Sequence, residues 1–474
     1  MTRTASGSDP MAAKTRIERD STGEMTVPAG AYWGAQTQRA VENFPISGYR
    51  FGRPFIRALG LIKQSAATVN RDLGRLDPKL ADLIIRAAQE VIDGKLHDHF
   101  VVDIFQTGSG TSTNMNANEV ISNRAIELAG GTIGSRDPIH PNDHVNMGQS
   151  SNDVIPTAIH IAAAEAIETD LRPALTGLAR ALEEKAAAFD RIVKIGRTHL
   201  QDATPIRLGQ EFSGYARQAR LAIGRAVKAV KALRELPIGG TAVGTGINTH
   251  PEFGKRMCEA IAQATGIDFV EAENHFEAQA AKDAVVEAGG HLRTIAVSLT
   301  KIANDIRMLA SGPRCGIGEI KLPATQPGSS IMPGKVNPVM SEMVVQVAAQ
   351  VMGNDLAVSI GGRDGHYELN VMMPMMAYNI LESTRLLAAA ASVFTERCVK
   401  GIEADEERCA ELIEGSLAMC TSLVPVIGYD KAAAIAKEAY ETGKTVRQVA
   451  REHKLLSDEE LNKILDPMSM TKPD

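Results

Sequence analysis

Residues 328–337 combine side chains and backbone that suit the binding of a small anion. They read Gly-Ser-Ser-Ile-Met-Pro-Gly-Lys-Val-Asn. Glycine lets main-chain N–H groups come close to a ligand, and serine, lysine and asparagine add hydroxyl, cationic and amide partners. Segments rich in Gly, Pro and Ser are also common in ordinary surface loops. The segment by itself therefore does not decide between a surface loop and an anion-binding loop.

Two further polar segments stand at the start of predicted helices. Residues 107–116 read Thr-Gly-Ser-Gly-Thr-Ser-Thr-Asn-Met-Asn and lead into a helical stretch at 117–120, and Ser-Ser-Asn-Asp at 150–153 opens the next helix. Hydroxyls and glycines at a helix start accompany free backbone N–H groups that bind anions. A well-capped helix without a ligand gives the same pattern and is the commoner case.

Residues 140–146 contain His140 and His144 with Asp143 between them. This composition raises a metal site as an alternative. The intervening Pro141 and the lack of helical periodicity argue against a regular ligand geometry. We therefore expect no metal here.

His199 is the best catalytic candidate among the histidines. It lies in residues 196–205, between two predicted helices, beside Thr198. Glu342, seven residues beyond Lys335, lies early in a predicted helix. A carboxylate there is available as a partner that orients a histidine.

The donors in these segments suit carboxylates. No Gly-x-Gly-x-x-Gly follows a predicted strand and no Gly-Lys-Ser/Thr phosphate loop is present, so we expect no cofactor. Removing a proton next to a carboxylate builds negative charge, which fixed donors stabilise by about 3–4 kcal/mol each when buried. Acid–base groups add roughly 10²–10⁴-fold. The residue types therefore indicate addition or elimination across a carbon–carbon bond of a small dicarboxylate.

Composition limits the class of protein. The chain has 474 residues, 44% of them apolar and only 4% aromatic, with a net charge of −6 and no basic run, which argues against a nucleic-acid surface. The five cysteines are scattered, as expected for reduced thiols in the cytoplasm. No signal peptide and no apolar run near the ~20 residues of a membrane span is visible. Residues 1–14 are predicted to be a disordered tail.

Apolar residues repeat at three- and four-residue spacing along the middle of the chain, which predicts a bundle of long helices. A kink or a fresh helix start is expected near Pro173. Strand signals are short, at residues 17–18 and in a hairpin near 25–27. The helical stripes are Phe212, Tyr215, Ala219, Ile223, Ala226, Val230 and Leu233; Leu292, Ile295, Leu299, Ile302, Ile306 and Leu309; Leu171, Leu175, Leu178 and Leu182; and Val344, Val347 and Val351.

The periodicity lapses around residues 137–148 and 401–405, where we place domain boundaries. The prediction is an N-terminal helical domain at 15–148, a central long-helix bundle at 149–404 and a small C-terminal helical domain at 405–474. The last domain carries short predicted helices around 431–442 and 457–465.

Taken together and in this order, the segments resemble the fumarase/aspartase superfamily of lyases. Residues 328–337 are similar to its signature, and the likeness runs from Tyr-Trp-Gly-Ala-Gln-Thr-Gln-Arg at 32–39 through nearly the whole chain. The resemblance implies a mainly α, three-domain fold with a central long-helix bundle that assembles in a homotetramer. It also implies active sites that each draw segments from three subunits.

Two features are similar to class II fumarases within the superfamily. His199 stands where aspartases usually carry Gln, and Ser109-Gly110 follow the fumarase pattern. Val339 leans toward aspartases and Gly148 stands where serine is frequent, so an aspartate ammonia-lyase is the alternative. Class II fumarases interconvert fumarate and (S)-malate through an aci-carboxylate intermediate in the tricarboxylic acid cycle.

The resemblance also implies roles for individual residues. Ser329 would take the C3 proton of malate, with its alkoxide stabilised by loop N–H groups and Lys335. His199 would help to protonate the departing hydroxyl, and Glu342 would orient His199. The residues that would hold the carboxylates are Ser109, Thr111, Ser150, Ser151, Asn152, Thr198, Ser330, Lys335 and Asn337. A second, non-catalytic carboxylate site would comprise His140, Pro141, Asn142 and Asp143.

Overall fold

The computed structural model describes residues 14–473, so the predicted disordered tail lies outside the described residues except for Lys14. The chain separates into two compact units, each built from three stretches of sequence. The first unit holds the residues up to Asp170, Ala226–Arg293 and Val351–Arg385, and the second holds Leu171–Arg225, Thr294–Gln350 and the chain from Leu386 onward. The three-domain division along the sequence stays a prediction.

The first unit begins with a β-hairpin. Strand β1 (Thr15–Asp20) pairs antiparallel with β2 (Gly23–Pro28), which confirms the predicted hairpin. The next helix, α1 (Ala35–Asn43), has N-terminal amides that donate to the buried carboxylate of Glu119. A negative charge at this position is favourable because it complements the unpaired N–H groups of a helix start.

Helix α2 (Arg53–Asp72) is the centre of the first unit. It packs against α3 (Pro78–Asp93), α5 (Ser151–Ala166) and α8 (Phe253–Thr265), and α3 in turn contacts α4 (Thr111–Leu128). Local sequence explains the bounds of α3: Asp77 caps its start and Gly94 ends it in a left-handed conformation. The core residues of α2 include Phe55, Ile56, Leu59 and Ile62.

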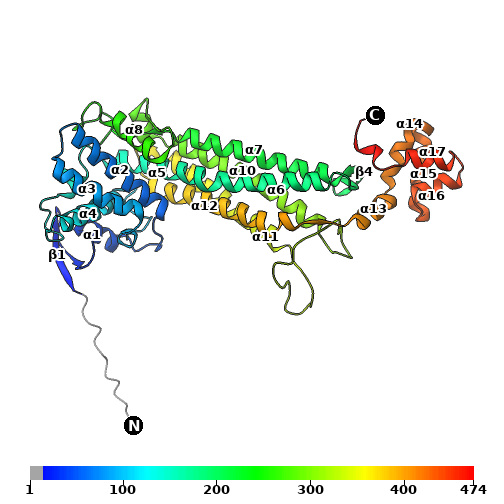
Figure 1. Ribbon diagram of the computed structural model, residues 1–474, viewed down its shortest axis with the longest axis horizontal. Helices are drawn as coiled ribbons and strands as arrows, with labels where there is room; N and C mark the ends of the chain where they lie inside the picture. The colour runs from blue at the N-terminus through cyan, green and yellow to red at the C-terminus, as the bar shows by residue number, and fades with distance from the viewer. Residues whose placement is uncertain (1–13, 474) are drawn as a thin grey trace, which may run out of the picture. The chain divides into compact units, whose positions relative to one another are not determined.

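Long helices carry the predicted apolar stripes, and Figure 1 shows them as extended rods: α7 (Leu208–Ala232), α10 (Asp283–Leu309), α11 (Val339–Arg363) and α12 (Met373–Arg397). Every stripe residue of α10 is buried. Glycines let these helices approach closely, because a Cβ on Gly361 would lie 2.6 Å from Met376 of α12 and one on Gly362 would lie 2.5 Å from Val286 of α10. The mainly α fold with long packed helices is therefore confirmed.

The second unit contains α6 (Arg172–Ala188), which follows a π-helical turn at Ile167–Leu171. Pro173 lies in the first turn of α6, and the backbone stays helical through Leu171, so the expected interruption is this π-helical turn within a continuous helical stretch. Strands β3 (Val193–Thr198) and β4 (Gln201–Arg207) form an antiparallel hairpin that the sequence analysis did not predict. Strand β7 (Ile320–Lys321) pairs with β10 (Glu403–Ala404).

Short helices close the second unit around a small apolar core that includes Leu423, Val449 and Leu461. The predicted helices near 431–442 and 457–465 are confirmed. These helices are α13 (Glu406–Gly415), α14 (Val424–Ile427), α15 (Tyr429–Thr442), α16 (Val446–Glu452) and α17 (Asp458–Ile464). Other short elements are β5 (Glu235–Leu236), β6 (Val270–Glu271), β8 (Gly365–His366), β9 (Leu369–Asn370) and α9 (His275–Ala280).

Helix α11 is long and apolar enough to cross a membrane by length and composition, which corrects the expectation that no apolar stretch approaches that length. In the most apolar 18-residue window of this helix, 33% of the window is buried inside the structure. One such helix is weak evidence for a span, because helices of a packed bundle meet the same criteria.

Candidate active site

The loop that carries Ser329 is closed at its base by backbone and amide contacts. The N–H of Gly328 donates to the Lys335 carbonyl at 2.9 Å, and the Asn337 amide donates to the Gly328 carbonyl at 2.6 Å. A Cβ at position 328 would lie 2.1 Å from the Lys335 carbonyl oxygen. Glycine is therefore required at position 328, because any side chain would open the base of the loop.

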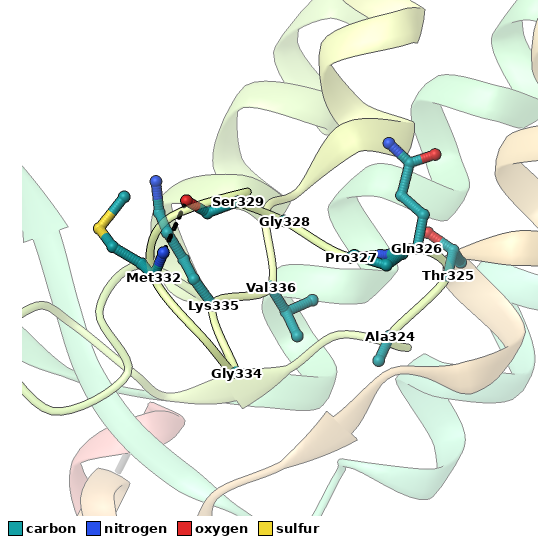
Figure 2. A pocket seen from close by; sticks show the side chains of 10 residues that line it. All are labelled: Ala324, Thr325, Gln326, Pro327, Gly328, Ser329, Met332, Gly334, Lys335 and Val336. Atoms are coloured by element: carbon teal, nitrogen blue, oxygen red, sulfur yellow. Dashed lines mark hydrogen bonds between the residues drawn. The ribbon is translucent and has the colours of Figure 1, made fainter.

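Two backbone N–H groups point at the Ser329 hydroxyl. Its Oγ accepts from the N–H of Ile331 at 3.2 Å and of Met332 at 3.1 Å, and Figure 2 draws the second contact. Fixed donors of this kind stabilise negative charge on an oxygen. The same geometry occurs in ordinary serine turns, where it only shapes the loop. The structure therefore shows the two donors at Ser329, and its role as a base stays a prediction.

The loop surrounds a cavity of about 440 Å³. Figure 2 shows Ser329 and Lys335 among its lining residues, together with Gly328 and Gly334. A neighbouring cavity of about 410 Å³ is lined by Lys335 and Asn337 on one side. Its other lining residues include Arg307 and Lys321, two cations that the sequence analysis did not single out because no motif marks them.

His199 lies at the tip of the β3–β4 hairpin. This corrects the prediction that it lies in a connection between two helices, for which no strands were expected. His199 and Leu200 form the two-residue turn, with φ values of 55° and 61°. Two central residues with positive φ define a type I′ turn, for which Asn-Gly is the usual signal. The sequence offered His-Leu instead, so the hairpin was missed. Non-glycine residues in this region carry strain and concentrate at functional sites.

Buried charges anchor this hairpin near its tip and near its base. Arg197, two residues before His199, donates from both terminal nitrogens to the Glu319 carboxylate at 2.8 and 3.0 Å. Lys194 lies 3.3 Å from Glu319 and 3.0 Å from Glu211. Glu319 immediately precedes β7, whose chain continues into the Ser329 loop. The charge cluster therefore ties the His199 hairpin to the segment that leads to Ser329.

Glu342 lies in the first turn of α11, as predicted, and is half-buried. Over residues 14–473 it makes no hydrogen bond to His199, and the Ser329 hydroxyl makes none to His199 either. Thr198 ends strand β3, and Ser330 is exposed in the loop. The pairing of Glu342 with His199 stays a prediction.

In the first unit, a chain of hydroxyls joins the starts of α4 and α5. The hydroxyls of Ser109 and Thr111 lie 2.7 Å apart, and those of Thr111 and Ser151 lie 2.7 Å apart. Gly110 precedes α4 in a left-handed conformation with φ 73°. The structure thus brings two of the predicted carboxylate-binding segments into direct contact.

The start of α5 is held by a capping box. The Ser150 hydroxyl accepts from the N–H of Asn152 at 3.2 Å, and the Asp153 carboxylate accepts from the N–H of Ser150 at 2.9 Å. The Asn152 amide donates to the carbonyl of Ala242 at 2.8 Å. The expected helix start at 150–153 is confirmed.

A glycine-rich segment beside α5 was missed by the sequence analysis. The N–H groups of Gly239 and Thr241 donate to Asp153 at 3.1 and 2.9 Å. A Cβ on Gly240 would lie 1.9 Å from the amide oxygen of Gln279, so glycine is needed there for close packing. The Gly-Gly-Thr composition resembles that of the other polar segments. This likeness was the signal by which the sequence could have marked the segment.

Residues 140–143 form a compact turn. His140 caps a π-helical turn at Pro141–Val145, where the sequence analysis expected no helix, and its Nδ1 accepts from the N–H groups of Asn142 and Asp143. Burial lowers the pKa of His140, and the Asp143 charge opposes that shift. The described part of the chain contains no group of three or more His, Cys, Asp or Glu residues arranged to hold a metal ion.

Comparison with known proteins places the chain in a family. A lyase family model matches residues 23–353, and a fumarase C C-terminus model matches residues 419–472. A class II fumarate hydratase from Halobacterium salinarum is 58% identical over 461 residues, covering 97% of this chain and 98% of that protein. This chain is a member of the class II fumarase family.

Further members of the family agree over the full length. A mitochondrial fumarate hydratase from Rhizopus oryzae is 55% identical, covering 96% of this chain and 93% of that protein. The crystal structure of a class II fumarase from Schistosoma mansoni is 40% identical and superimposes with a TM-score of 0.94, covering 97% of this chain and 100% of that one. The resemblance of the chain to the fumarase/aspartase superfamily is confirmed.

Proposed function

We propose that this chain catalyses the reversible hydration of fumarate to (S)-malate. The observation that carries the proposal is the Ser329 hydroxyl, which accepts two backbone N–H groups in a loop closed by Asn337. Full-length relatives named fumarate hydratase support the same reaction, and they do not favour the ammonia-lyase alternative. The enzyme is a hydro-lyase that works by acid–base chemistry.

In the dehydration direction, Ser329 takes the C3 proton of malate. The N–H groups of Ile331 and Met332 stabilise its alkoxide, and Lys335 adds a positive charge on the lining of the same cavity. The electron pair from the C–H bond moves onto the adjacent carboxylate as an aci-carboxylate. The C2 hydroxyl then leaves as water with a proton delivered by His199, which Glu342 orients.

We assign the substrate carboxylates to two groups of donors. The first group is the hydroxyl chain and the α5 start, and the second is the loop and hairpin residues. His140, Pro141, Asn142 and Asp143 serve as a second, non-catalytic carboxylate site. The first group comprises Ser109, Thr111, Ser150, Ser151 and Asn152, and the second group comprises Thr198, Ser330, Lys335 and Asn337.

We place the enzyme in the cytoplasm as a homotetramer whose active sites are shared between subunits. The long helices expose apolar side chains, including Val297 of α10, Leu356 of α11 and Val393 of α12. Exposed apolar surface of this kind is typical of helices that pack against other chains. The net charge of −6 does not favour nucleic acid as a partner.

The decisive experiment compares two assays on the purified protein. Fumarate alone should yield malate without any release or uptake of ammonia, followed by absorbance at the fumarate band and by product analysis. Aspartate formed only when ammonium is present would make the chain an ammonia-lyase. A chelator should leave turnover unchanged, and inactivation by it would revive a metal role for His140 and His144.

His199→Gln is expected to lower kcat by roughly 10²–10³-fold, because an amide cannot deliver a proton to the leaving hydroxyl. The affinity for a dicarboxylate should change little, since the carboxylate donors are retained. Steady-state kinetics and calorimetric binding of succinate measure the two effects separately. Leu200→Ala, in the same turn, is the control and should keep near-normal kcat. Near-normal turnover in His199→Gln would remove His199 from the mechanism.

A further inference from the structure

Lys63, in the middle of α2, is fully buried beneath the start of α5. Its ammonium group donates to the side-chain oxygens of Asn146 and Gln149, both at 2.9 Å. Burial lowers the pKa of Lys63 to about 7, and the nearby Asp153 charge opposes that shift. A lysine in this position requires an explanation, because an apolar side chain would pack there without a desolvation cost.

Asn146 and Gln149 belong to the turn that runs directly into Ser150. The Asn146 amide donates to the Gln149 carbonyl at 3.2 Å, and the Gln149 amide donates to the carbonyls of Val145 and Met147. Both side chains therefore use their N–H groups within the turn and their oxygens on Lys63, and the Asn146 oxygen also accepts from the Asn114 amide at 3.2 Å. The lysine acts as the common donor that fixes both amides, and through them the backbone entering α5.

Asp153 holds the same helix start through a second set of contacts. It is fully buried, and its oxygens accept from the N–H groups of Ser150, Gly239 and Thr241. Burial raises its pKa to about 6, and the three backbone donors and the Lys63 charge oppose that shift. A buried cation and a buried carboxylate thus flank the residues 150–152 that we assign to carboxylate binding.

We propose that Lys63 is a positioning residue for dicarboxylate binding at the start of α5. It acts through Asn146 and Gln149, which set the backbone that presents Ser150, Ser151 and Asn152. Its charge also raises the positive potential that an anion meets at this helix start. The inference rests on the proposed function, because it assumes that this helix start binds a substrate carboxylate.

The test measures binding of succinate, a saturated four-carbon dicarboxylate that the enzyme cannot hydrate. Lys63→Met keeps the length and apolar stem of the side chain but removes its charge and donors. We expect its succinate Kd to rise about tenfold or more, as for loss of hydrogen bonds from a charged donor. KM for fumarate should rise by a similar factor while kcat stays within about threefold, because the proton-transferring groups are untouched.

Lys282→Met is the matched control. Lys282 is also buried, and it donates to the carbonyls of Ala278, Gln279 and Ala281. The Lys282→Met substitution removes a buried lysine without removing a contact to residues 146–153. The succinate Kd of this variant should therefore stay within about twofold of the parent value. An equal loss of affinity in both variants would overturn the proposal, because the effect would then be general.

Gln149→Ala keeps the proposal testable if Lys63→Met does not fold. It removes one partner of Lys63 together with the bonds of that side chain to the Val145 and Met147 carbonyls, and it should itself weaken succinate binding. When Lys63→Met does fold, the double variant should lose less succinate affinity than the sum of the two single losses, since both changes remove the Lys63–Gln149 contact. Fully additive losses, or unchanged succinate binding in either single variant, would overturn the proposal.

Failure of the two proposals can be told apart. If the parent protein binds succinate but does not hydrate fumarate, the proposed function fails while the Lys63 comparison still stands. If the parent does not bind succinate at all, the carboxylate site at α5 and the role of Lys63 both fail. A fall in kcat at unchanged KM would also contradict the positioning role.

Discussion

Ser329→Ala is expected to lower kcat for malate dehydration by at least about 10³-fold, because the proposed mechanism assigns removal of the C3 proton to the Ser329 hydroxyl. The Ile331 and Met332 amides would lose the oxygen to which they donate. Succinate affinity should stay within a few-fold of the parent value, since the carboxylate donors remain. Progress curves at saturating malate and calorimetry with succinate measure the two quantities.

Ser330→Ala is the matched control, because Ser330 is the adjacent hydroxyl in the same loop. Its oxygen receives no backbone donor among the described residues, whereas that of Ser329 receives two. We expect Ser330→Ala to raise KM while kcat stays within roughly tenfold. The reverse pattern, with turnover lost in Ser330→Ala and kept in Ser329→Ala, would assign the base to Ser330. Size-exclusion chromatography shows whether each variant keeps the parent assembly.

Glu319→Gln is expected to reduce the free energy of unfolding by about 3–5 kcal/mol. Glu319 is completely buried, and its carboxylate pairs with the side chains of Arg197 and Lys194. These two side chains are only 17% and 1% exposed, so both cations depend on the charge of Glu319. The isosteric amide leaves both cations in place without that negative charge. Urea unfolding followed by circular dichroism, at one fixed protein concentration, measures the loss.

Glu183→Gln provides the comparison for that loss. Glu183 also accepts two bonds from one arginine, Arg220, but the two side chains are 43% and 45% exposed. Water and salt screen such a pair, so the unfolding free energy should change by less than about 1 kcal/mol. Equal effects of the two substitutions would mean that the Glu319 cluster does not stabilise the His199 hairpin through buried charge.

Local chemistry was predictable where the determinants are close in sequence. The helix start at Ser150 follows from a hydroxyl at the cap and a carboxylate three residues later, and the structure contains that capping box. The apolar stripe of α10 has the period of a helix, and each of its residues is buried. Pro173 marked the interruption at the start of α6, where a π-helical turn leads into the helix.

Predictions failed where the deciding contacts are distant in sequence or where the local signal is unusual. His199 and Leu200 occupy turn positions that normally need Asn or Gly, so the hairpin beneath them had no sequence mark. The anchors of that hairpin, Arg197 and Glu319, lie 122 residues apart. Lys63 lies 83 residues from Asn146 in the sequence. The apolar pattern of α2 does not indicate that this lysine binds the side chains of a distant turn.

Residue types and short spacings were enough to indicate the available chemistry: hydroxyls and glycines at helix starts, and the Gly-Ser-Ser loop with its lysine and asparagine. These features are displayed directly by a single chain, whereas the weight given to His199 came from the resemblance to a family. The folded chain was needed to show that two amides donate to Ser329, that His199 lies at a hairpin tip with positive φ, and that buried charges support both this hairpin and the start of α5. Those facts depend on burial and on partners far away in the chain, because the stability of a buried charge is set by the groups around it rather than by its neighbours in sequence.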